Sequence, residues 1–326
     1  MRVGVLGTGH IVYKITETLK AMDGVECYAI ASRTMERAIE AAKEFGYERA
    51  YGTYEELVQD EAVELVYIAT PHSRHYEDMV LCIEHGKPVL CEKAFTFNAA
   101  QAREIERMSK ERGVYVAEAI WTRYMPSRQI INELLDKGTI GRVSTMTANL
   151  SYAVCHRERL KRPELAGGAL LDVGVYGLNF ATMHMGKDIE RIDSSVQMLD
   201  TGVDGGETIT IHYRDGRMAV LTHSICVRSD RRGIFHGERG YMIVDNINNP
   251  LSIDVYDLSD QLVSHIDVPE QISGYEYQFI EAMDRIAAGE RESVSMPLSE
   301  SVYIMELADA IRKQWGLVYP QERLSK

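Results

Sequence analysis

The first 120 residues alternate between short, wholly apolar runs and longer segments with the periodicity of amphipathic helices. One such segment, MERAIEAAKEF, is stopped by Gly46, and another lies between Asn98, a predicted N-cap, and Gly113. Apolar strands without polar alternation, separated by helices, are typical of a parallel sheet covered on both faces. The pattern therefore predicts a doubly wound α/β domain over residues 1–120. Its expected strands are 3–6, 25–31, 65–69, 88–91 and 114–118.

The pattern changes after about residue 120. Long runs in which polar and apolar residues alternate, joined by turn signals such as DGGE and RDGR, predict a mostly antiparallel sheet. One helix at 174–184 interrupts these strands, and the segments EYQFIEAMDRIAAG and SESVYIMELADAIRKQWG predict two further helices. We therefore expect a second, α+β domain over residues 121–326. Its expected strands are 142–152, 189–198, 207–213, 218–226, 241–245 and 251–257.

Composition limits the partners of the protein. The formal net charge is −13, with 49 acidic against 36 basic residues, so nucleic acid and anionic lipid would be repelled. No apolar run approaches the roughly 20 residues of a membrane helix. The five cysteines show no CxxC spacing, which indicates reduced thiols in a cytosolic protein and no zinc site. We therefore expect a cytoplasmic protein with a small-molecule substrate and without nucleic-acid or membrane partners.

A glycine turn follows the first strand, in the stretch VGVLGTGHIV. Two glycines there let backbone N–H groups approach a pyrophosphate at the N-terminus of the next helix. The third glycine of the dinucleotide fingerprint is absent, because Val12 stands in its place. A GxG turn alone also occurs where nothing binds, but its position in the first strand–turn–helix favours a dinucleotide site. The predicted cofactor contacts are Gly7, Thr8, Gly9, His10 and Ile11.

The second strand ends in Ser32 and Arg33, without the carboxylate that an NAD site of this kind directs at the ribose hydroxyls. A hydroxyl beside a guanidinium suits the 2′-phosphate of NADP, since arginine binds phosphate in a bidentate manner. The alternative is that Arg33 is an exposed loop charge without a ligand. We expect NADP as the preferred cofactor, with NAD as the alternative.

The third strand is followed by ATPHSRHYED, which contains a turn and two histidines. Thr70 and Pro71 lie at the carboxyl edge of the predicted sheet, where open α/β sheets bind ligands. His72 and His75 have a spacing that suits a metal, but no third ligand stands nearby in the sequence. We therefore expect no metal and assign these four residues to the cofactor site. Capping of the next helix is the alternative for the histidines.

The fourth strand ends in the charged pair Glu92–Lys93. These side chains are either solvated loop charges or groups delivered to the sheet edge that also carries Gly7 and Thr70. A lysine there can hydrogen-bond a substrate oxygen and lower the pKa of a nearby phenol. We place Glu92 and Lys93 at the cofactor, and Lys93 also in the catalytic set.

The stretch GGALLDVGVYGLNF separates Asp172 and Tyr176 by four residues. In a helix both side chains would lie on one face, and the Gly-Gly start permits a close approach of the backbone. Tyr176 would then act as acid or base, and Asp172 would hold Lys93 or a substrate hydroxyl. The alternative is that Asp172 is an N-cap and Tyr176 a core aromatic residue.

Over its whole length the chain resembles the glucose-fructose oxidoreductase/inositol dehydrogenase (Gfo/Idh/MocA) family. The motifs that carry the resemblance are the GxG turn, ATPHSRHYE, CEKAFT, EAIWTRYMP and AGGALLDVGVYGLNF, which occur in the family's order and spacing. EAIWTRYMP and Tyr176 resemble in particular the dihydrodiol dehydrogenase and anhydrofructose reductase-like branch.

This resemblance implies a Rossmann domain followed by a C-terminal domain whose large open sheet commonly forms a dimer interface. It implies hydride transfer between a nicotinamide and a carbinol or carbonyl carbon. It maps Lys93, Asp172 and Tyr176 to the reacting end, and Trp121 and Arg123 near the nicotinamide or substrate. A homodimer through the C-terminal sheet is therefore expected.

Two residues depart from the family pattern. Ala94 stands where the common Glu-Lys-Pro motif has proline. If relatives use a cis peptide after the lysine, Ala94 either adopts it as well or lets Lys93 be aimed differently. Val12 in place of a small residue can shift the first helix slightly, but neither change removes a chemical group.

The leading hypothesis is an NADP-preferring oxidoreductase that acts on a sugar-like, diol or dicarbonyl substrate. A non-catalytic sensor of the same fold, like the family's galactose-regulon corepressor, is the first alternative, and an NAD-dependent glycosidase is another. The intact set of Lys93, Asp172 and Tyr176 favours an enzyme, since a binding protein needs no acid–base pair. Pocket walls are expected from 151–164 and 223–237, whose basic residues indicate a hydroxylated or anionic ligand unless they are surface charges.

Overall fold

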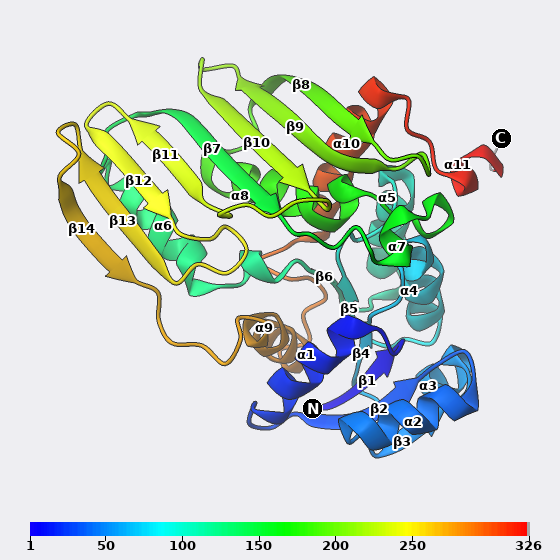
Figure 1. The fold of residues 1–326 in the computed structure, drawn as a ribbon. Helices are drawn as coiled ribbons and strands as arrows, with labels where there is room; N and C mark the ends of the chain where they lie inside the picture. Colours follow the sequence, from blue (N-terminus) through cyan, green and yellow to red (C-terminus); the bar gives the residue numbers. More distant parts are fainter. Residues whose placement is uncertain (325–326) are drawn as a thin grey trace. The chain divides into compact units, whose positions relative to one another are not determined.

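The computed structural model describes residues 1–324, which divide into two compact units (Figure 1). The first unit contains Met1–Tyr124 together with Gln271–Met305. The second contains Met125–Glu270 together with residues 306–324. The sequence analysis assigned all residues after 120 to one domain, whereas the contacts of the chain group 271–305 with the first unit.

The first unit is built on a six-stranded parallel sheet with the order β3-β2-β1-β4-β5-β6. The predicted doubly wound sheet is therefore confirmed, with β3 as an additional edge strand that the sequence analysis did not predict. The strands are β1 (Arg2–Leu6), β2 (Glu26–Ala31), β3 (Arg49–Tyr51), β4 (Leu65–Ile68), β5 (Val89–Glu92) and β6 (Val116–Ala119). The helices are α1 (His10–Lys20), α2 (Met35–Phe45), α3 (Tyr54–Gln59), α4 (His75–Glu84), α5 (Ala99–Arg112) and α9 (Glu276–Ala287).

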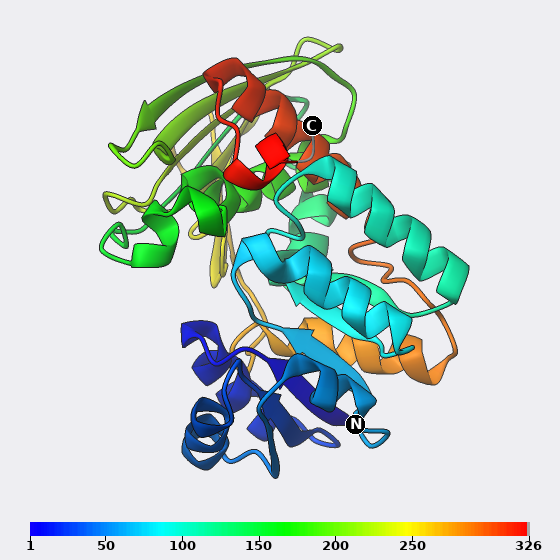
Figure 2. The ribbon, with the colours of Figure 1, turned by 90° about the vertical axis from the view of Figure 1, so that its right-hand side faces the viewer.

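One apolar core joins the parallel sheet to α1 and α9. Val5 and Tyr67 of the sheet, Ile15 of α1 and Phe279 of α9 belong to it, and the rings of Tyr67 and Phe279 lie 5.4 Å apart. On the other side, α4 and α5 lie side by side (Figure 2).

The predicted ends of α2 and α5 are confirmed. Gly46 and Gly113 follow them in the left-handed conformation, and the Asn98 side chain accepts a hydrogen bond from the Gln101 N–H. Both glycines have φ values near +70°, which other residues adopt at a cost, so the two helices end where glycine permits it.

The second unit contains an eight-stranded sheet with the order β14-β13-β12-β11-β7-β10-β9-β8. Neighbouring strands are antiparallel except for β7 and β10, which run parallel, so the prediction of a mostly antiparallel sheet is confirmed. β11 and β14 were not predicted. The strands are β7 (Val143–Ser151), β8 (Ile189–Met198), β9 (Asp204–Tyr213), β10 (Met218–Ser224), β11 (Gly233–Gly237), β12 (Gly240–Val244), β13 (Ser252–Asp257) and β14 (Leu262–Asp267).

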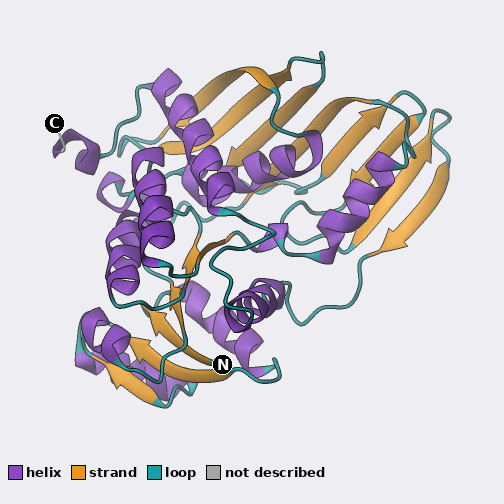
Figure 3. Cartoon of the chain, turned by 180° about the vertical axis from the view of Figure 1, so that it is seen from behind, coloured by secondary structure: helices purple, strands orange, loops and turns teal. Residues whose placement is uncertain are grey.

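The helices of the second unit lie on one face of this sheet, and the other face carries no helix within residues 1–324 (Figures 1 and 3). None of the described helices has the length and apolar composition needed to cross a lipid bilayer. The helices are α6 (Pro126–Asp136), α7 (Glu158–Lys161), α8 (Val175–Met185), α11 (Pro320–Leu324) and the C-terminal part of α10 (Leu298–Trp315). A π-helical turn, Leu170–Gly174, leads directly into α8.

Glu118 is a buried carboxylate in β6, and it fixes the main chain beyond the neighbouring β5. Its Oε1 accepts a hydrogen bond from the Phe95 N–H at 3.1 Å, and the residue is 1% exposed. Burial raises the pKa of Glu118 to about 7, although the nearby Ser301 hydroxyl and the charge of Arg123 act in the opposite direction. The carboxyl group therefore titrates near neutral pH while it remains in the core.

We expect Glu118→Gln to remove a pH-dependent loss of stability. The pKa of Glu118 is raised from 4.5 when unfolded to about 7 when folded, so the folded protein binds the proton more tightly. Ionisation therefore destabilises the wild type by about 1.4 kcal/mol per pH unit between these two values. The unfolding temperature of Glu118→Gln, measured relative to the wild type, should rise from pH 5 to pH 8. The exposed control Glu77→Gln should show no such trend, and a constant difference for Glu118→Gln would contradict the prediction.

Candidate active site

The glycine turn after β1 has the geometry that a dinucleotide phosphate needs. Gly7 has φ +102°, and a Cβ at that position would lie 2.9 Å from the Ala69 carbonyl oxygen. Gly9 is the N-cap of α1, no side chain caps this helix end, and no acidic residue stands in its first turn. The positive end of α1 is therefore available to an anion. Val12, which replaces the third glycine, is fully buried in the core.

The other predicted residues of this turn lie at the surface of the unit. Thr8 and Ile11 are half-buried, and Gly9 and His10 are exposed. A ligand phosphate can therefore reach the turn from solvent without displacing core residues.

Ser32 and Arg33 lie between β2 and α2. Ser32 is 5% exposed, and its N–H donates to the Tyr51 carbonyl oxygen at 3.1 Å. The Arg33 side chain is exposed, and no carboxylate of residues 1–324 forms an ion pair with it. A guanidinium held at the end of a parallel strand without an acidic partner fits a phosphate ligand.

Thr70 and Pro71 follow β4 at the carboxyl edge of the sheet. The Thr70 hydroxyl donates to Asp78 Oδ2 at 2.7 Å, and Asp78 also pairs with Arg74 at 3.1 Å. Pro71 is exposed, while the Thr70 hydroxyl anchors the turn to α4.

The two predicted histidines occupy different environments. His72 is 5% exposed, in a short 3₁₀ turn before α4, and its ring lies 5.7 Å from that of His75. His75 is fully buried, with Nδ1 2.8 Å from the Ala94 oxygen and Nε2 2.9 Å from the Thr70 oxygen. Burial lowers the pKa of His75 to about 4, so the ring is neutral and donates to one of these carbonyls at a time. Neither histidine belongs to a group of three metal-ligating side chains within the described residues.

His75 therefore links two segments of the sheet edge. Thr70 belongs to the turn after β4, and Ala94 directly follows Lys93. The ring bridges these two stretches of main chain from inside the unit, where it is screened from solvent.

Lys93 follows β5 and is half-buried, and the peptide bond between Lys93 and Ala94 is cis. Of the two alternatives for Ala94, the structure therefore shows the cis bond without proline. Glu92, the last residue of β5, is 8% exposed and accepts a hydrogen bond from the Tyr67 hydroxyl of β4. Gly7, Thr70 and Lys93 follow adjacent parallel strands, so they lie along one sheet edge as predicted.

Trp121 and Arg123 lie in a 3₁₀ turn after β6 and are 4% and 3% exposed. The Trp121 ring stacks on Tyr275 with the ring centroids 4.1 Å apart. Arg123 pairs with Glu300 at 3.2 Å. Both partners come from 271–305, so this late segment of the chain fixes the turn.

Asp172 and Tyr176 lie on consecutive turns in the second unit. Asp172 belongs to the π-helical turn and Tyr176 to the first turn of α8, whose N-cap is Gly174. Asp172 is therefore not an N-cap, and the helical spacing predicted for the pair is observed. Asp172 Oδ1 pairs with Arg159 Nη2 of α7 at 2.9 Å, which gives one arginine of 151–164 a defined partner. Asp172 and Tyr176 are 7% and 8% exposed.

The predicted catalytic residues belong to different units: Lys93 to the first, and Asp172 and Tyr176 to the second. The sequence analysis missed Tyr67, whose hydroxyl donates to the Glu92 side chain before Lys93, and Glu118, which accepts from the Phe95 N–H after it. The available signal was a single polar group in each of two otherwise apolar strands, LVYI and VAEA.

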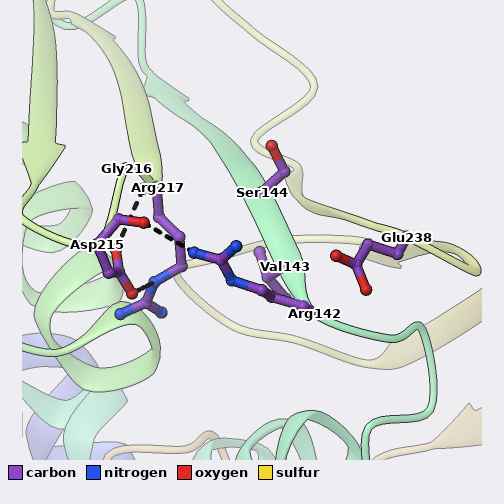
Figure 4. A pocket seen from close by; sticks show the side chains of 7 residues that line it. All are labelled: Arg142, Val143, Ser144, Asp215, Gly216, Arg217 and Glu238. Atoms are coloured by element: carbon purple, nitrogen blue, oxygen red, sulfur yellow. Dashed lines mark hydrogen bonds and ion pairs between the residues drawn. The ribbon is translucent and has the colours of Figure 1, made fainter.

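Figure 4 shows a surface pocket of about 370 Å³ in the second unit. Both arginines that line the pocket contact Asp215. Arg217 Nε forms an ion pair with the Asp215 carboxylate at 2.6 Å, and the Arg142 guanidinium donates to the Asp215 main-chain carbonyl oxygen at 2.7 Å. None of the predicted site residues lines this pocket, so it is separate from the candidate active site. It is lined by Arg142, Val143, Ser144, Asp215, Gly216, Arg217 and Glu238.

Comparison with known proteins places the chain in a family. Residues 1–119 match the model of an oxidoreductase family with an NAD-binding Rossmann fold, and residues 129–243 match the GFO/IDH/MocA C-terminal domain. The chain is 31% identical to trans-1,2-dihydrobenzene-1,2-diol dehydrogenase of Mus musculus and 32% identical to that of Bos taurus, covering 99% of both chains in each case.

Solved structures agree with this assignment. The 3-ketoreductase KijD10 of Actinomadura kijaniata, in complex with NADP and TDP-benzene, is 26% identical, with a TM-score of 0.88 over 96% of this chain and 97% of that chain. These relatives support an oxidoreductase over the sensor and the glycosidase that the sequence left open. The chain belongs to the Gfo/Idh/MocA family of NAD(P)-dependent oxidoreductases, in the branch that contains the dihydrodiol dehydrogenases.

Proposed function

We propose that the protein transfers a hydride between NADP(H) and the carbinol or carbonyl carbon of a diol, dicarbonyl or sugar-like substrate. The observation that carries the proposal is the full-length similarity to dihydrodiol dehydrogenases, in a chain with Lys93 at the ligand-binding edge of its parallel sheet. When bound, the nicotinamide supplies or accepts the hydride. The chain binds and orients the reactants and moves the proton.

The acid–base chemistry is assigned to three residues. The Lys93 ammonium donates a hydrogen bond to the reacting oxygen and stabilises its developing negative charge during oxidation. The Tyr176 phenol exchanges the hydroxyl proton. Asp172, held by Arg159 at 2.9 Å, orients a substrate hydroxyl. The remaining predicted contacts of the sheet edge, including Glu92, Trp121 and Arg123, shape the cofactor site.

NADP is proposed as the preferred cofactor. The support is the exposed Arg33 beside Ser32, in a position where an NAD site would have a carboxylate. A 2′-phosphate would give Arg33 the anionic partner that it lacks among residues 1–324.

We further propose a cytoplasmic homodimer formed through the open face of the eight-stranded sheet. All five cysteines are free thiols, as in proteins of a reducing compartment. On the open face, five directly paired residues from five neighbouring strands form a row in which every side chain is uncharged and half-buried. One aspartate stands at each end of this row. Such a face suits a self-complementary interface. The row with its two flanking aspartates is Asp193, Thr210, Val220, Thr147, Ile234, Ile243 and Asp254.

Lys93→Met tests the catalytic assignment. Oxidation of trans-1,2-dihydrobenzene-1,2-diol with NADP, and reduction of α-dicarbonyls and keto-sugars with NADPH, would be followed by the nicotinamide absorbance. We expect kcat to fall by about a hundredfold or more, because the charge that stabilises the reacting oxygen is lost. The exposed control Lys110→Met should retain turnover. Near-normal turnover in Lys93→Met would refute the assignment.

Arg33→Gln tests the cofactor preference. A charge-assisted contact with phosphate contributes roughly 1.5–3 kcal/mol, so we expect the dissociation constant of NADPH to rise about tenfold or more. The dissociation constant of NADH should change little, because NADH has no 2′-phosphate. Lys43→Gln, with the same charge change in the last turn of α2, is the control. An equal effect on both cofactors would contradict the preference.

Val220→Glu tests the dimer. We expect light scattering to give twice the 36.9 kDa chain mass for the wild type and the single chain mass for the variant, because two buried carboxylates would face each other. Val227→Glu, the same change at an exposed position after β10, should leave the dimer intact. A monomeric wild type would rule out the proposed interface.

A further inference from the structure

Three titratable side chains form a buried cluster under α8, which we call the acid–imidazole cluster: Asp204, Glu207 and His223. Glu207 of β9 and His223 of β10 are directly paired residues of the antiparallel ladder. Glu207 Oε1 lies 3.1 Å from His223 Nδ1, and both side chains are 0% exposed. Asp204, also fully buried, accepts a hydrogen bond from the Leu170 N–H at 2.5 Å.

The main chain that carries Asp172 and Tyr176 lies directly against this cluster. Each cluster residue meets one glycine of the GGALLDVGVYG stretch: Asp204 meets Gly168, Glu207 meets Gly174, and His223 meets Gly177. A Cβ on Gly174 would lie 2.6 Å from Glu207 Oε1, and a Cβ on Gly168 or Gly177 would lie closer still to its cluster residue. Backbone and polar side chains are therefore in contact at three successive points, with no room for a methyl group between them.

The glycines and the reactive residues occupy different faces of this segment. Gly174 and Gly177 are three residues apart and both meet the sheet, while Asp172 and Tyr176 are four residues apart. Successive residues of a helix are about 100° apart, so Tyr176 projects away from the face that Gly177 presents to His223. A shift of the segment on the cluster would therefore move both side chains together.

Burying the polar atoms of the acid–imidazole cluster costs folding free energy. Asp204 Oδ1, Glu207 Oε2 and His223 Nε2 are buried and have no hydrogen-bond partner among residues 1–324. Burial raises the pKa of Asp204 to about 7, raises that of Glu207 and lowers that of His223 to about 3. In the uncharged forms that burial favours, the Glu207 carboxyl O–H can donate to His223 Nδ1 across their 3.1 Å contact. Apolar residues would fill this space without that cost, which points to a role beyond packing.

We propose that Asp204, Glu207 and His223 are positioning residues for the reaction proposed above, on which this inference rests. The cluster holds the main chain of the π-helical turn and of the first turn of α8, and thereby sets the side chains of Asp172 and Tyr176. The three glycines let the main chain lie directly on the cluster.

Glu207→Leu is the first test, since an apolar side chain of similar size keeps the core filled and removes the hydrogen bond to His223. We expect kcat for trans-1,2-dihydrobenzene-1,2-diol to fall at least about tenfold, because small displacements of reacting groups have large effects on rate. KM and the dissociation constant of NADPH should change less than about twofold. Glu207→Gln, whose amide N–H can donate to Nδ1, should retain most of the turnover.

Val255→Ala is the matched control, because Val255 is a buried residue of β13 in the same sheet and lies away from the cluster. It should lower the unfolding temperature and leave kcat unchanged. Hydrogen exchange followed by mass spectrometry, without cofactor, should show faster exchange of Leu170–Tyr176 amides in Glu207→Leu and not in Val255→Ala. If Glu207→Leu does not fold, Gly177→Ala, which displaces His223, serves for the same two measurements.

A double-mutant cycle separates positioning from general damage. In the Tyr176→Phe background, Glu207→Leu should cause a smaller further loss of kcat than in the wild type, because of the two positioned residues only Asp172 still acts. Additive losses, or a kcat and an exchange rate like those of Val255→Ala, would overturn this inference alone. Normal turnover in Lys93→Met and Tyr176→Phe would instead overturn the proposed function, and this inference with it.

Discussion

Buried carboxyl groups that accept hydrogen bonds from the main chain fix both segments to which the chemistry is assigned. Glu118 accepts the Phe95 N–H, two residues after Lys93. Asp204 accepts the Leu170 N–H, two residues before Asp172. A carboxyl group removed from water strongly favours any donor that remains within reach, so each contact restricts the main chain to a narrow range of positions. Rigid support of this kind is what a reaction that depends on orientation requires.

Burial raises the pKa of Glu118 and that of Asp204 to about 7 each, but the Glu207–His223 pair beside Asp204 differs from Glu118 in its surroundings. Glu118 lies near Arg123 and Ser301, which favour its ionised form and partly offset burial. No neighbouring group offsets the effect of burial on Glu207 or His223, because burial is the only cause of both pKa shifts. In the first unit, therefore, the carboxyl group that accepts the Phe95 N–H, two residues after Lys93, titrates near pH 7. In the second unit, burial disfavours the charged forms of both Glu207 and His223, which lie against the main chain at Gly174 and Gly177.

Local signals in the sequence were sufficient for most of the first unit. Gly46, Asn98 and Gly113 mark helix ends through their own conformation or side chain, and the structure has each of them in that role. The edge strand β3 is only three residues long and therefore too short for a pattern. The helix after it did carry a signal that was overlooked, since Thr53 and Glu56 form a capping box.

The second unit was harder to predict because its missed elements depend on neighbours. β11 begins and ends with glycine, and it is a strand because β7 and β12 pair with it on both sides. The same holds for the candidate site. The order of the parallel strands is enough to predict that Gly7, Thr70 and Lys93 lie along one edge of the sheet. It does not predict that the His75 ring contacts the carbonyl oxygens of Thr70 and Ala94.

The glycines of the GGALLDVGVYG stretch show where sequence reasoning stops. A glycine in a predicted helix costs about 1 kcal/mol relative to alanine and is usually explained by a special backbone conformation. That explanation holds for Gly168, whose φ is +118°, but not for Gly174, whose φ of −65° suits any residue. Gly174 and Gly177 are required because polar side chains from β9 and β10 occupy the space of a Cβ. These side chains, Glu207 and His223, lie 33 and 46 positions further along the chain, and only the folded sheet brings them into contact with Gly174 and Gly177.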